Sequence, residues 1–208
     1  TLQADADALE SLGVDLLFTP KAEDIYSRGL EQQTFVEVPG LSYMICGASR
    51  PGHFRGVATI VCKLFNMVQP DVAMFGQKDY QQLQIIRQFV KDLCMPIDII
   101  QQPITREADG LAMSSRNGYI TAEERPKANQ LHESLNWIAE QIKSGKRDFL
   151  ALETEAKQQI EDAGFKMDYI TVCNSKTLEM AAVDDKQITV LGAMYTASAR
   201  LIDNVSLG

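Results

Sequence analysis

The spacing of apolar residues along the chain alternates between a helical period and short continuous runs. Residues 53–68 and residues 80–93 carry apolar side chains at helical spacing. A short apolar run follows each segment, at residues 72–75 and 97–100, and turn residues end both runs. Helix, strand, helix, strand in this order is typical of right-handed crossovers in a parallel sheet. We therefore expect a parallel-sheet domain in the first half of the chain.

The N-terminal residues predict a helix followed by a strand. Leucines at helical spacing predict a helix over residues 1–12, and Gly13 is suited to end it because glycine tolerates positive φ. The apolar run at residues 14–18 predicts a buried strand. Residues 34–38 predict a further strand ahead of the Pro39-Gly40 turn.

The pattern changes near residue 105, where we place a domain boundary. Residues 106–119 are polar and rich in turn signals, and Thr121 with Glu124 forms a capping-box pattern. Helices are predicted from Pro126 and over residues 149–163, and strands at residues 169–173, 188–195 and 200–203 suit a small antiparallel sheet. The predicted fold class is α/β: a parallel-sheet domain at residues 1–104, then a smaller α/β domain at residues 105–208.

Composition and charge narrow the possible partners. The 208 residues are 45% apolar and 23% charged, and the net charge of −8 argues against general affinity for nucleic acid or anionic membrane. It leaves open a local basic site for phosphate. No apolar run approaches the roughly 20 residues that span a bilayer. We expect neither nucleic acid nor a membrane as a partner.

The four cysteines predict a reducing compartment. Cys46, Cys62, Cys94 and Cys173 are far apart, form no C-x-x-C pair and each lie in an apolar run. We therefore expect four buried, reduced thiols, no zinc site and a cytoplasmic location.

The turn Gly76-Gln77-Lys78-Asp79 is the first candidate for chemistry. It connects a predicted buried strand to the N-terminus of a helix, where an open parallel sheet binds ligands. Helix-end amides, a close-approach glycine and the Lys78 ammonium suit phosphate, and Asp79 could accept hydrogen bonds from a ribose. The alternative is a solvated turn in which Asp79 caps the helix.

Two further segments offer hydroxyls and cations. Met113-Ser114-Ser115-Arg116 could surround a triphosphate, since a guanidinium holds two oxygens at once; the alternative is a surface loop capped by serines. In the cationic turn around His53, the histidine either contacts an anionic substrate or simply begins a helix. We expect a structural role for His132. Gln81-Gln82 opens the next helix, facing either the pocket or solvent.

Together, these segments resemble pantothenate synthetase, in order and over essentially the whole chain. The segments that carry the resemblance are Pro51-Gly52-His53-Phe54-Arg55-Gly56-Val57, Val68-Gln69-Pro70-Asp71, Phe75-Gly76-Gln77-Lys78-Asp79-Tyr80-Gln81-Gln82-Leu83, Arg106 to Asn117, and Ala199-Arg200-Leu201-Ile202-Asp203-Asn204. The resemblance implies a nucleotidylyltransferase-type Rossmann domain and a smaller C-terminal domain that closes over ATP. It also implies a homodimer.

The resemblance further implies a reaction and a set of site residues. Pantoate would attack the α-phosphate of Mg²⁺-ATP to give pantoyl adenylate, and β-alanine would then displace AMP. Carried over by position, Gln82 and His53 bind substrates, with His53 and Arg116 near the carboxylate of β-alanine. The ATP site comprises Gly76, Gln77, Lys78, Asp79, Thr105, Met113, Ser114, Ser115 and Arg116. We assign catalysis to Lys78, Arg116, Ser114 and Ser115, and we assign no protein ligand to the metal.

The sequence departs from the family in two places. Gln77 stands where the family commonly has Glu, which we expect to matter little. The family's His-x-Gly-His motif is absent, since the only histidines are His53 and His132. We therefore expect a fragment that lacks this N-terminal part and catalyses the reaction poorly or not at all. The open alternatives are a ligase for another small acid and a non-catalytic nucleotide-binding or dimerisation module.

Overall fold

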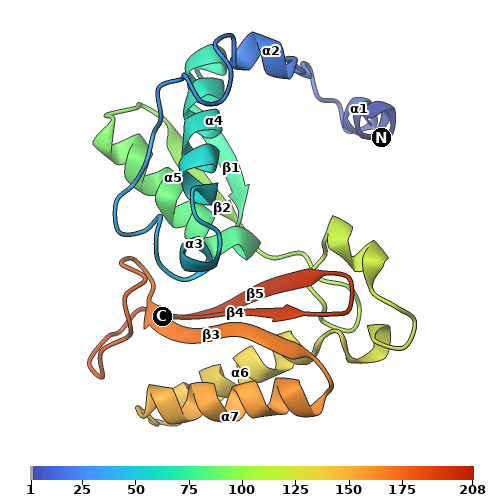
Figure 1. Ribbon diagram of the computed structural model, residues 1–208, viewed down its shortest axis with the longest axis vertical. Coiled ribbons are helices and arrows are strands. Elements are labelled where there is room, and N and C mark those ends of the chain that lie inside the picture. Colours follow the sequence, from blue (N-terminus) through green and yellow to red (C-terminus); the bar gives the residue numbers. More distant parts are fainter. Residues whose placement is uncertain (1) are drawn as a thin grey trace. The chain divides into compact units, whose positions relative to one another are not determined.

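The computed structural model describes residues 2–208 and contains two compact units (Figure 1). One unit runs to Phe35, and the other runs from Val36 to Gly208. Among the described residues, no helix combines the length and apolar character needed to cross a membrane.

The first unit contains helix α1 (Leu2–Ser11) and the short helix α2 (Ala22–Ile25). Helix α1 ends ahead of Gly13, whose φ of 73° is the left-handed conformation predicted for it. The strand predicted at residues 14–18 is wrong. These residues pair with no neighbouring strand, and Leu16 is 81% exposed. An apolar run becomes a strand only when a partner satisfies its backbone groups.

The second unit begins with the parallel-sheet region that the sequence predicts. Its elements are α3 (Cys46–Ser49), α4 (His53–Val68), β1 (Val72–Gly76), the 3₁₀ helix η1 (Gln77–Asp79), α5 (Tyr80–Asp92) and β2 (Asp98–Gln102). Strand β1 pairs with β2 in parallel, with Val72 opposite Asp98 and Gly76 opposite Gln102. This confirms the crossover read from the apolar pattern.

The strand predicted at residues 34–38 is also wrong, because a side chain takes the place of a neighbouring strand. The Val36 amide donates to the Thr59 hydroxyl at 3.0 Å, so helix α4 holds this extended segment. Val38 is buried in the core that α4 and α5 share.

The C-terminal half carries an antiparallel sheet, as predicted. Its elements are the 3₁₀ helices η2 (Ser115–Tyr119) and η3 (Arg125–Lys127), helices α6 (Gln130–Lys143) and α7 (Phe149–Asp162), and strands β3 (Lys166–Asn174), β4 (Ile188–Tyr195) and β5 (Arg200–Leu207). The strand order is β3-β4-β5. Helices α6 and α7 cover one face of this sheet, and their apolar stripes form its core (Figure 1).

Helix α6 begins four residues later than predicted. Pro126 lies within η3, and the α-helix starts at Gln130. The Thr121 amide donates to Glu124, and the Glu124 amide donates to the Thr121 hydroxyl, so the predicted capping box is present ahead of a single turn. The boundary near residue 105 falls between the two sheets and stays a prediction.

Four cysteine thiols are free, but their burial differs from the prediction. Cys46 and Cys173 are buried, Cys62 is half-buried and Cys94 is exposed. Cys94 lies two residues past the end of α5, with φ of 52°. The expectation of four buried thiols is therefore wrong for Cys94.

Candidate functional site

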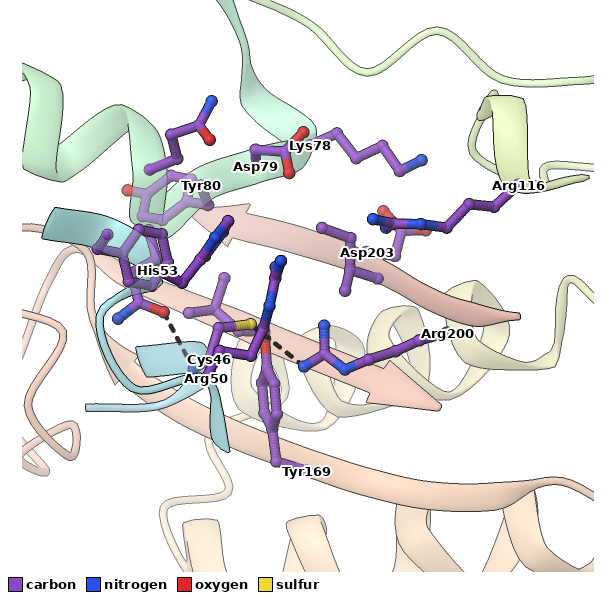
Figure 2. A pocket seen from close by; sticks show the side chains of 15 residues that line it. Cys46, Arg50, His53, Lys78, Asp79, Tyr80, Arg116, Tyr169, Arg200 and Asp203 are labelled. Atoms are coloured by element: carbon purple, nitrogen blue, oxygen red, sulfur yellow. Dashed lines mark hydrogen bonds between the residues drawn. The ribbon is translucent and has the colours of Figure 1, made fainter. Parts of the chain in front are cut away.

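A cavity of about 210 Å³ lies where the start of α4 and the turn η1 approach the antiparallel sheet (Figure 2). Helices α3 and α4, the η1–α5 junction, the loop at Arg116 and all three strands of the antiparallel sheet contribute side chains. Its lining residues are Cys46, Arg50, His53, Phe54, Lys78, Asp79, Tyr80, Gln81, Gln82, Arg116, Tyr169, Leu191, Arg200, Ile202 and Asp203.

The cavity brings together five of the residues selected from the sequence. These are His53, Lys78, Asp79, Gln82 and Arg116, which come from three separate segments. The other selected residues do not line the cavity: Gly76, Gln77, Thr105, Met113, Ser114 and Ser115.

The turn η1 places Lys78 and Asp79 at the carboxyl end of β1, the edge at which parallel sheets bind ligands. Asp79 occupies the N-cap position of α5, yet its side chain makes no capping hydrogen bond. Asp79 is therefore the N-cap residue of α5, as the solvated-turn alternative states, but its carboxylate does not bond the amides of the helix. Figure 2 shows this side chain beside Lys78.

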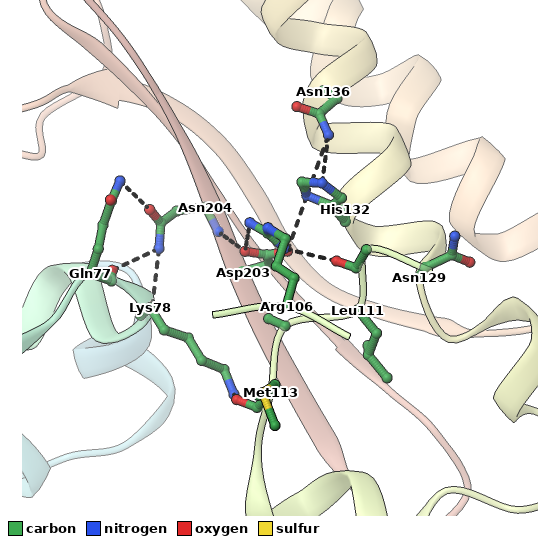
Figure 3. A network of polar contacts seen from close by, with 12 residues as sticks. Gln77, Lys78, Arg106, Leu111, Met113, Asn129, His132, Asn136, Asp203 and Asn204 are labelled. Carbon is green, nitrogen blue, oxygen red and sulfur yellow. Dashed lines mark hydrogen bonds and ion pairs between the residues drawn. The ribbon is translucent and has the colours of Figure 1, made fainter. Parts of the chain in front are cut away.

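The Lys78 ammonium bridges two of the selected segments. It donates to the Met113 carbonyl at 3.0 Å, which joins η1 to the loop that carries Arg116 (Figure 3). Burial lowers the pKa of Lys78, and the Arg116 charge lowers it further, while Asp79 opposes both effects. An anion entering the cavity would favour the charged form of this lysine.

Besides Lys78, four cationic or titratable side chains line the cavity: Arg50, His53, Arg116 and Arg200. Arg50 and His53 flank Gly52, whose φ of 77° allows the tight turn before α4. Burial lowers the pKa of His53, and the neighbouring Arg50 charge adds to the effect. With Arg116 and Arg200, this makes a cavity suited to anions despite the acidic average of the chain.

The floor of the cavity is built from residues that sequence reasoning did not select. Arg200 donates through Nε and Nη2 to Asp168 at 2.9 and 2.7 Å, and through Nη2 to the Cys46 sulfur at 3.3 Å. The Tyr169 hydroxyl lies 3.1 Å from the same sulfur, and burial raises the pKa of Tyr169. Arg200 belongs to a segment that carried the resemblance, whereas no sequence signal marked Cys46 or Tyr169.

The two glutamines at the start of α5 have different roles. Gln81 is 5% exposed, accepts from the Cys46 amide at 3.1 Å and donates to the carbonyls of Leu41 and Met44. It therefore fixes the loop ahead of α4. Gln82 is half-buried and lines the cavity, as the pocket-facing alternative requires.

Hydrogen bonds within residues 113–116 and to Thr105 fix the conformation of this loop. The Ser114 hydroxyl accepts from the Arg116 amide at 3.2 Å and so caps η2. The Thr105 carbonyl accepts from the Met113 amide at 2.9 Å. Ser114 therefore has the capping role that the surface-loop alternative gives to the serines. Arg116, in the same loop, lines the cavity.

A polar network surrounds Asp203, one of the residues that line the cavity (Figure 3). Arg106 donates two hydrogen bonds to the Asp203 carboxylate at 2.6 and 2.9 Å, and the His132 ring lies 3.3 Å from it. Asn136 contacts the His132 ring. His132 thus contacts a carboxylate and an amide, as a structural histidine does. Among residues 2–208, no three His, Cys, Asp or Glu side chains are grouped so that they could hold a metal ion.

The chain matches one protein family over nearly its full length. A model of the family described as pantoate-beta-alanine ligase matches residues 1–206. The pantothenate synthetase of Saccharophagus degradans is 63% identical over 207 residues, which are 100% of this chain and 73% of that protein. The pantothenate synthetase of Cellvibrio japonicus is 58% identical, with the same coverage of both chains.

Solved structures give the same result. Pantothenate synthetase from Thermus thermophilus aligns with a TM-score of 0.92 and 39% identity, covering 99% of this chain and 74% of that one. Pantoate-beta-alanine ligase from Francisella tularensis, complexed with beta-gamma ATP and β-alanine, aligns with a TM-score of 0.78 and 34% identity. It is covered over 69% of its length, against 99% of this chain.

The fold is that of an α/β ligase, with a parallel-sheet region followed by a smaller antiparallel-sheet region. The chain belongs to the pantoate–β-alanine ligase family.

Proposed function

We propose that the protein takes part in the ATP-dependent ligation of pantoate and β-alanine to give pantothenate. The observation that carries this proposal is the cavity in which Lys78, Asp79, Arg116, His53 and Gln82 meet. The family match supports the two carbon substrates. The relative from Francisella tularensis, whose structure contains beta-gamma ATP and β-alanine, supports the nucleotide and the amine.

The reaction proceeds in two displacements. The pantoate carboxylate attacks the α-phosphorus of ATP, a P–O bond forms and diphosphate leaves, which gives pantoyl adenylate. The free amine of β-alanine then attacks the acyl carbon, AMP leaves with the bonding electrons, and the amine loses a proton. Neither step requires a covalent bond to the protein, so catalysis consists of alignment and stabilisation of charge on phosphate oxygens.

Different side chains of the cavity have different roles in this reaction. Lys78 and Arg116 bind phosphate oxygens, and a guanidinium can hold two of them at once. Asp79 accepts from the ribose hydroxyls, Gln82 binds pantoate, and His53 lies near the β-alanine carboxylate. The remaining assigned positions contact the nucleotide through backbone or hydroxyl groups: Gly76, Gln77, Thr105, Met113, Ser114 and Ser115.

Mg²⁺ enters with ATP as part of the substrate. No protein ligand is assigned to the ion, and the Asp79 carboxylate, which lines the cavity and makes no capping hydrogen bond, is assigned to the ribose hydroxyls. When bound, the ion neutralises charge on the phosphates. The side chains of Lys78 and Arg116 supply the rest of the positive charge.

The 208-residue polypeptide by itself is proposed to be inactive or nearly so. Its histidines are His53 and His132, and neither belongs to a His-x-Gly-His motif. We further propose a homodimer, as the family resemblance implies, and a cytoplasmic location, which four free thiols support. Pantothenate formation by the purified polypeptide would contradict the proposed inactivity.

Pantoate selectivity tests the substrate assignment. Isothermal titration in the presence of a non-hydrolysable ATP analogue should show tighter binding of pantoate than of lactate or glycerate. Gln82→Ala should weaken pantoate binding about tenfold, since it removes hydrogen bonds made only to this substrate. ATP-analogue binding should stay unchanged in that variant. Equal binding of all three acids would favour a ligase for another small acid.

A further inference from the structure

Asn204 is a fully buried side chain that connects strand β5 to the turn η1 (Figure 3). It is 2% exposed, and its Nδ2 atom donates to the Gln77 carbonyl at 2.9 Å and to the Lys78 carbonyl at 3.1 Å. Its Oδ1 atom accepts from Gln77 Nε2 at 3.3 Å. One amide therefore binds two consecutive carbonyls of the turn and the side chain of the first residue.

The geometry of β5 makes this contact possible. Successive side chains of a strand point to opposite faces. Asp203 binds Arg106 and His132 on the side of α6, and the next residue, Asn204, reaches η1 on the other side. Strand β5 thus links the helical layer of the antiparallel sheet to the turn at the cavity.

The turn needs an external anchor because it is short. A 3₁₀ helix of three residues has few internal hydrogen bonds and poor bond geometry. Fixing the carbonyls of Gln77 and Lys78 sets the backbone direction from which the Lys78 and Asp79 side chains enter the cavity. Gln77 Nε2 adds a second support by contacting the Ser206 hydroxyl at 3.3 Å.

We propose that Asn204 is a positioning residue that presents the η1 turn to the phosphates of the nucleotide. It acts through the backbone of Gln77 and Lys78 and does not line the cavity itself. This inference rests on the proposed function, because it requires phosphate to bind at Lys78. It gives a role to the last residue of the segment from Ala199 to Asn204.

The alternative role is purely structural: a satisfied buried amide that stabilises the fold. The two roles differ in which ligand they affect. A positioning residue for the turn acts on the phosphates and leaves the adenosine contacts intact, whereas a general loss of fold weakens both. The ratio of ATP to adenosine affinity therefore separates the roles.

The experiment compares Asn204→Leu with Asn66→Leu by isothermal titration of Mg²⁺-ATP and of adenosine. Asn204→Leu keeps a side chain of similar size and removes both donated hydrogen bonds without adding a charge near the phosphates. Asn66 is exposed on α4 and bonds its amide only within that helix, so Asn66→Leu is the matched control. Gln77→Ala serves as a second variant because Gln77 is half-buried and its loss is easier for the fold to tolerate.

Asn204→Leu should weaken ATP binding about tenfold or more and change adenosine binding less than about twofold. Gln77→Ala should weaken ATP binding in the same direction but by less. In the ligand-free chain, amide hydrogen exchange over residues 77–80 should be faster in Asn204→Leu, with β4 unchanged. Asn66→Leu should match the unmodified chain throughout.

Two results would overturn the inference while leaving the proposed function in place. One is unchanged ATP affinity in both Asn204→Leu and Gln77→Ala. The other is a parallel loss of ATP and adenosine affinity. A folded, unmodified chain that binds no ATP would instead overturn the proposed function, and with it the phosphate role of Asn204.

Discussion

Lys78 and His53 reach the same cavity from different helices, and both have a lowered pKa there because they are partly buried. Positive neighbours strengthen the effect, since Arg116 acts on Lys78 and Arg50 acts on His53. At neutral pH the cavity therefore carries its positive charge mainly on arginines and Lys78, with His53 neutral. An anionic ligand would reverse part of this effect by favouring the protonated forms.

The protonation of His53 can be measured directly. NMR titration should give His53 a midpoint below 6.5, its ordinary value, and His53→Gln would assign its signal among the two histidines. Because the folded chain binds this proton less readily than the unfolded chain, the free energy of unfolding should fall as pH drops below 6.5. His53→Gln should remove that part of the pH dependence. A midpoint at or above 6.5 would contradict the described burial.

Asp203 should contribute more to stability than any exposed ion pair. Burial raises its pKa, but hydrogen bonds from His132 and Arg106 outweigh burial and lower it overall. Asp203→Asn leaves Arg106 without its buried partner and should cost about 3–5 kcal/mol in urea unfolding. The loss should be full at neutral pH and shrink as pH falls below 3.8, where the carboxylate of the unmodified chain becomes protonated.

An exposed pair provides the control for Asp203. Lys143 donates to Glu140 at 2.8 Å, and their side chains are 59% and 66% exposed. Lys143→Ala should therefore change the free energy of unfolding by less than about 0.5 kcal/mol. Equal effects of Asp203→Asn and Lys143→Ala would show that the buried network adds little.

At the scale of elements, local patterns predicted the helices better than the strands. The 3.6-residue period identified α4 with its bounds, because α4 satisfies its own backbone and buries one stripe. The runs at residues 14–18 and 34–38 have the composition of strands but no strand partners in the structure. Whether a run forms a strand depends on pairing with residues distant in sequence. The composition of the run alone therefore does not predict whether it finds a partner.

Replacing a glycine by alanine should have opposite effects on stability in β4 and in α4, because the two glycines are packed differently. A Cβ atom on Gly192 in β4 would lie 2.8 Å from Leu131 Cδ1 and 3.1 Å from Leu135 Cδ2, both on α6. Gly192→Ala should therefore cost about 1–3 kcal/mol through overpacking. A Cβ atom on Gly56, inside α4, would meet no neighbouring atom within 4 Å, so Gly56→Ala should add about 0.5–1 kcal/mol. Thermal unfolding measures both, and shifts in the same direction would contradict this packing.

At the scale of the whole molecule, the sequence predicted several residues that line the cavity but did not predict those that form its floor. Glycines, a lysine and an arginine at turn positions pointed to Lys78 and Arg116, because phosphate chemistry requires these residue types. Cys46 and Tyr169 carried no such signal. They join the site because strand β3 of the antiparallel sheet contacts helix α3, through residues more than a hundred positions apart.

The central claim is that the cavity binds the phosphates of Mg²⁺-ATP. The most direct test is isothermal titration of Mg²⁺-ATP into the chain, with Lys78→Ala and Arg116→Ala as variants and Lys143→Ala as the exposed-lysine control. We predict binding that weakens at least about tenfold in both cavity variants and stays unchanged in the control. No binding by a demonstrably folded chain, or equal binding by all four proteins, would contradict the account.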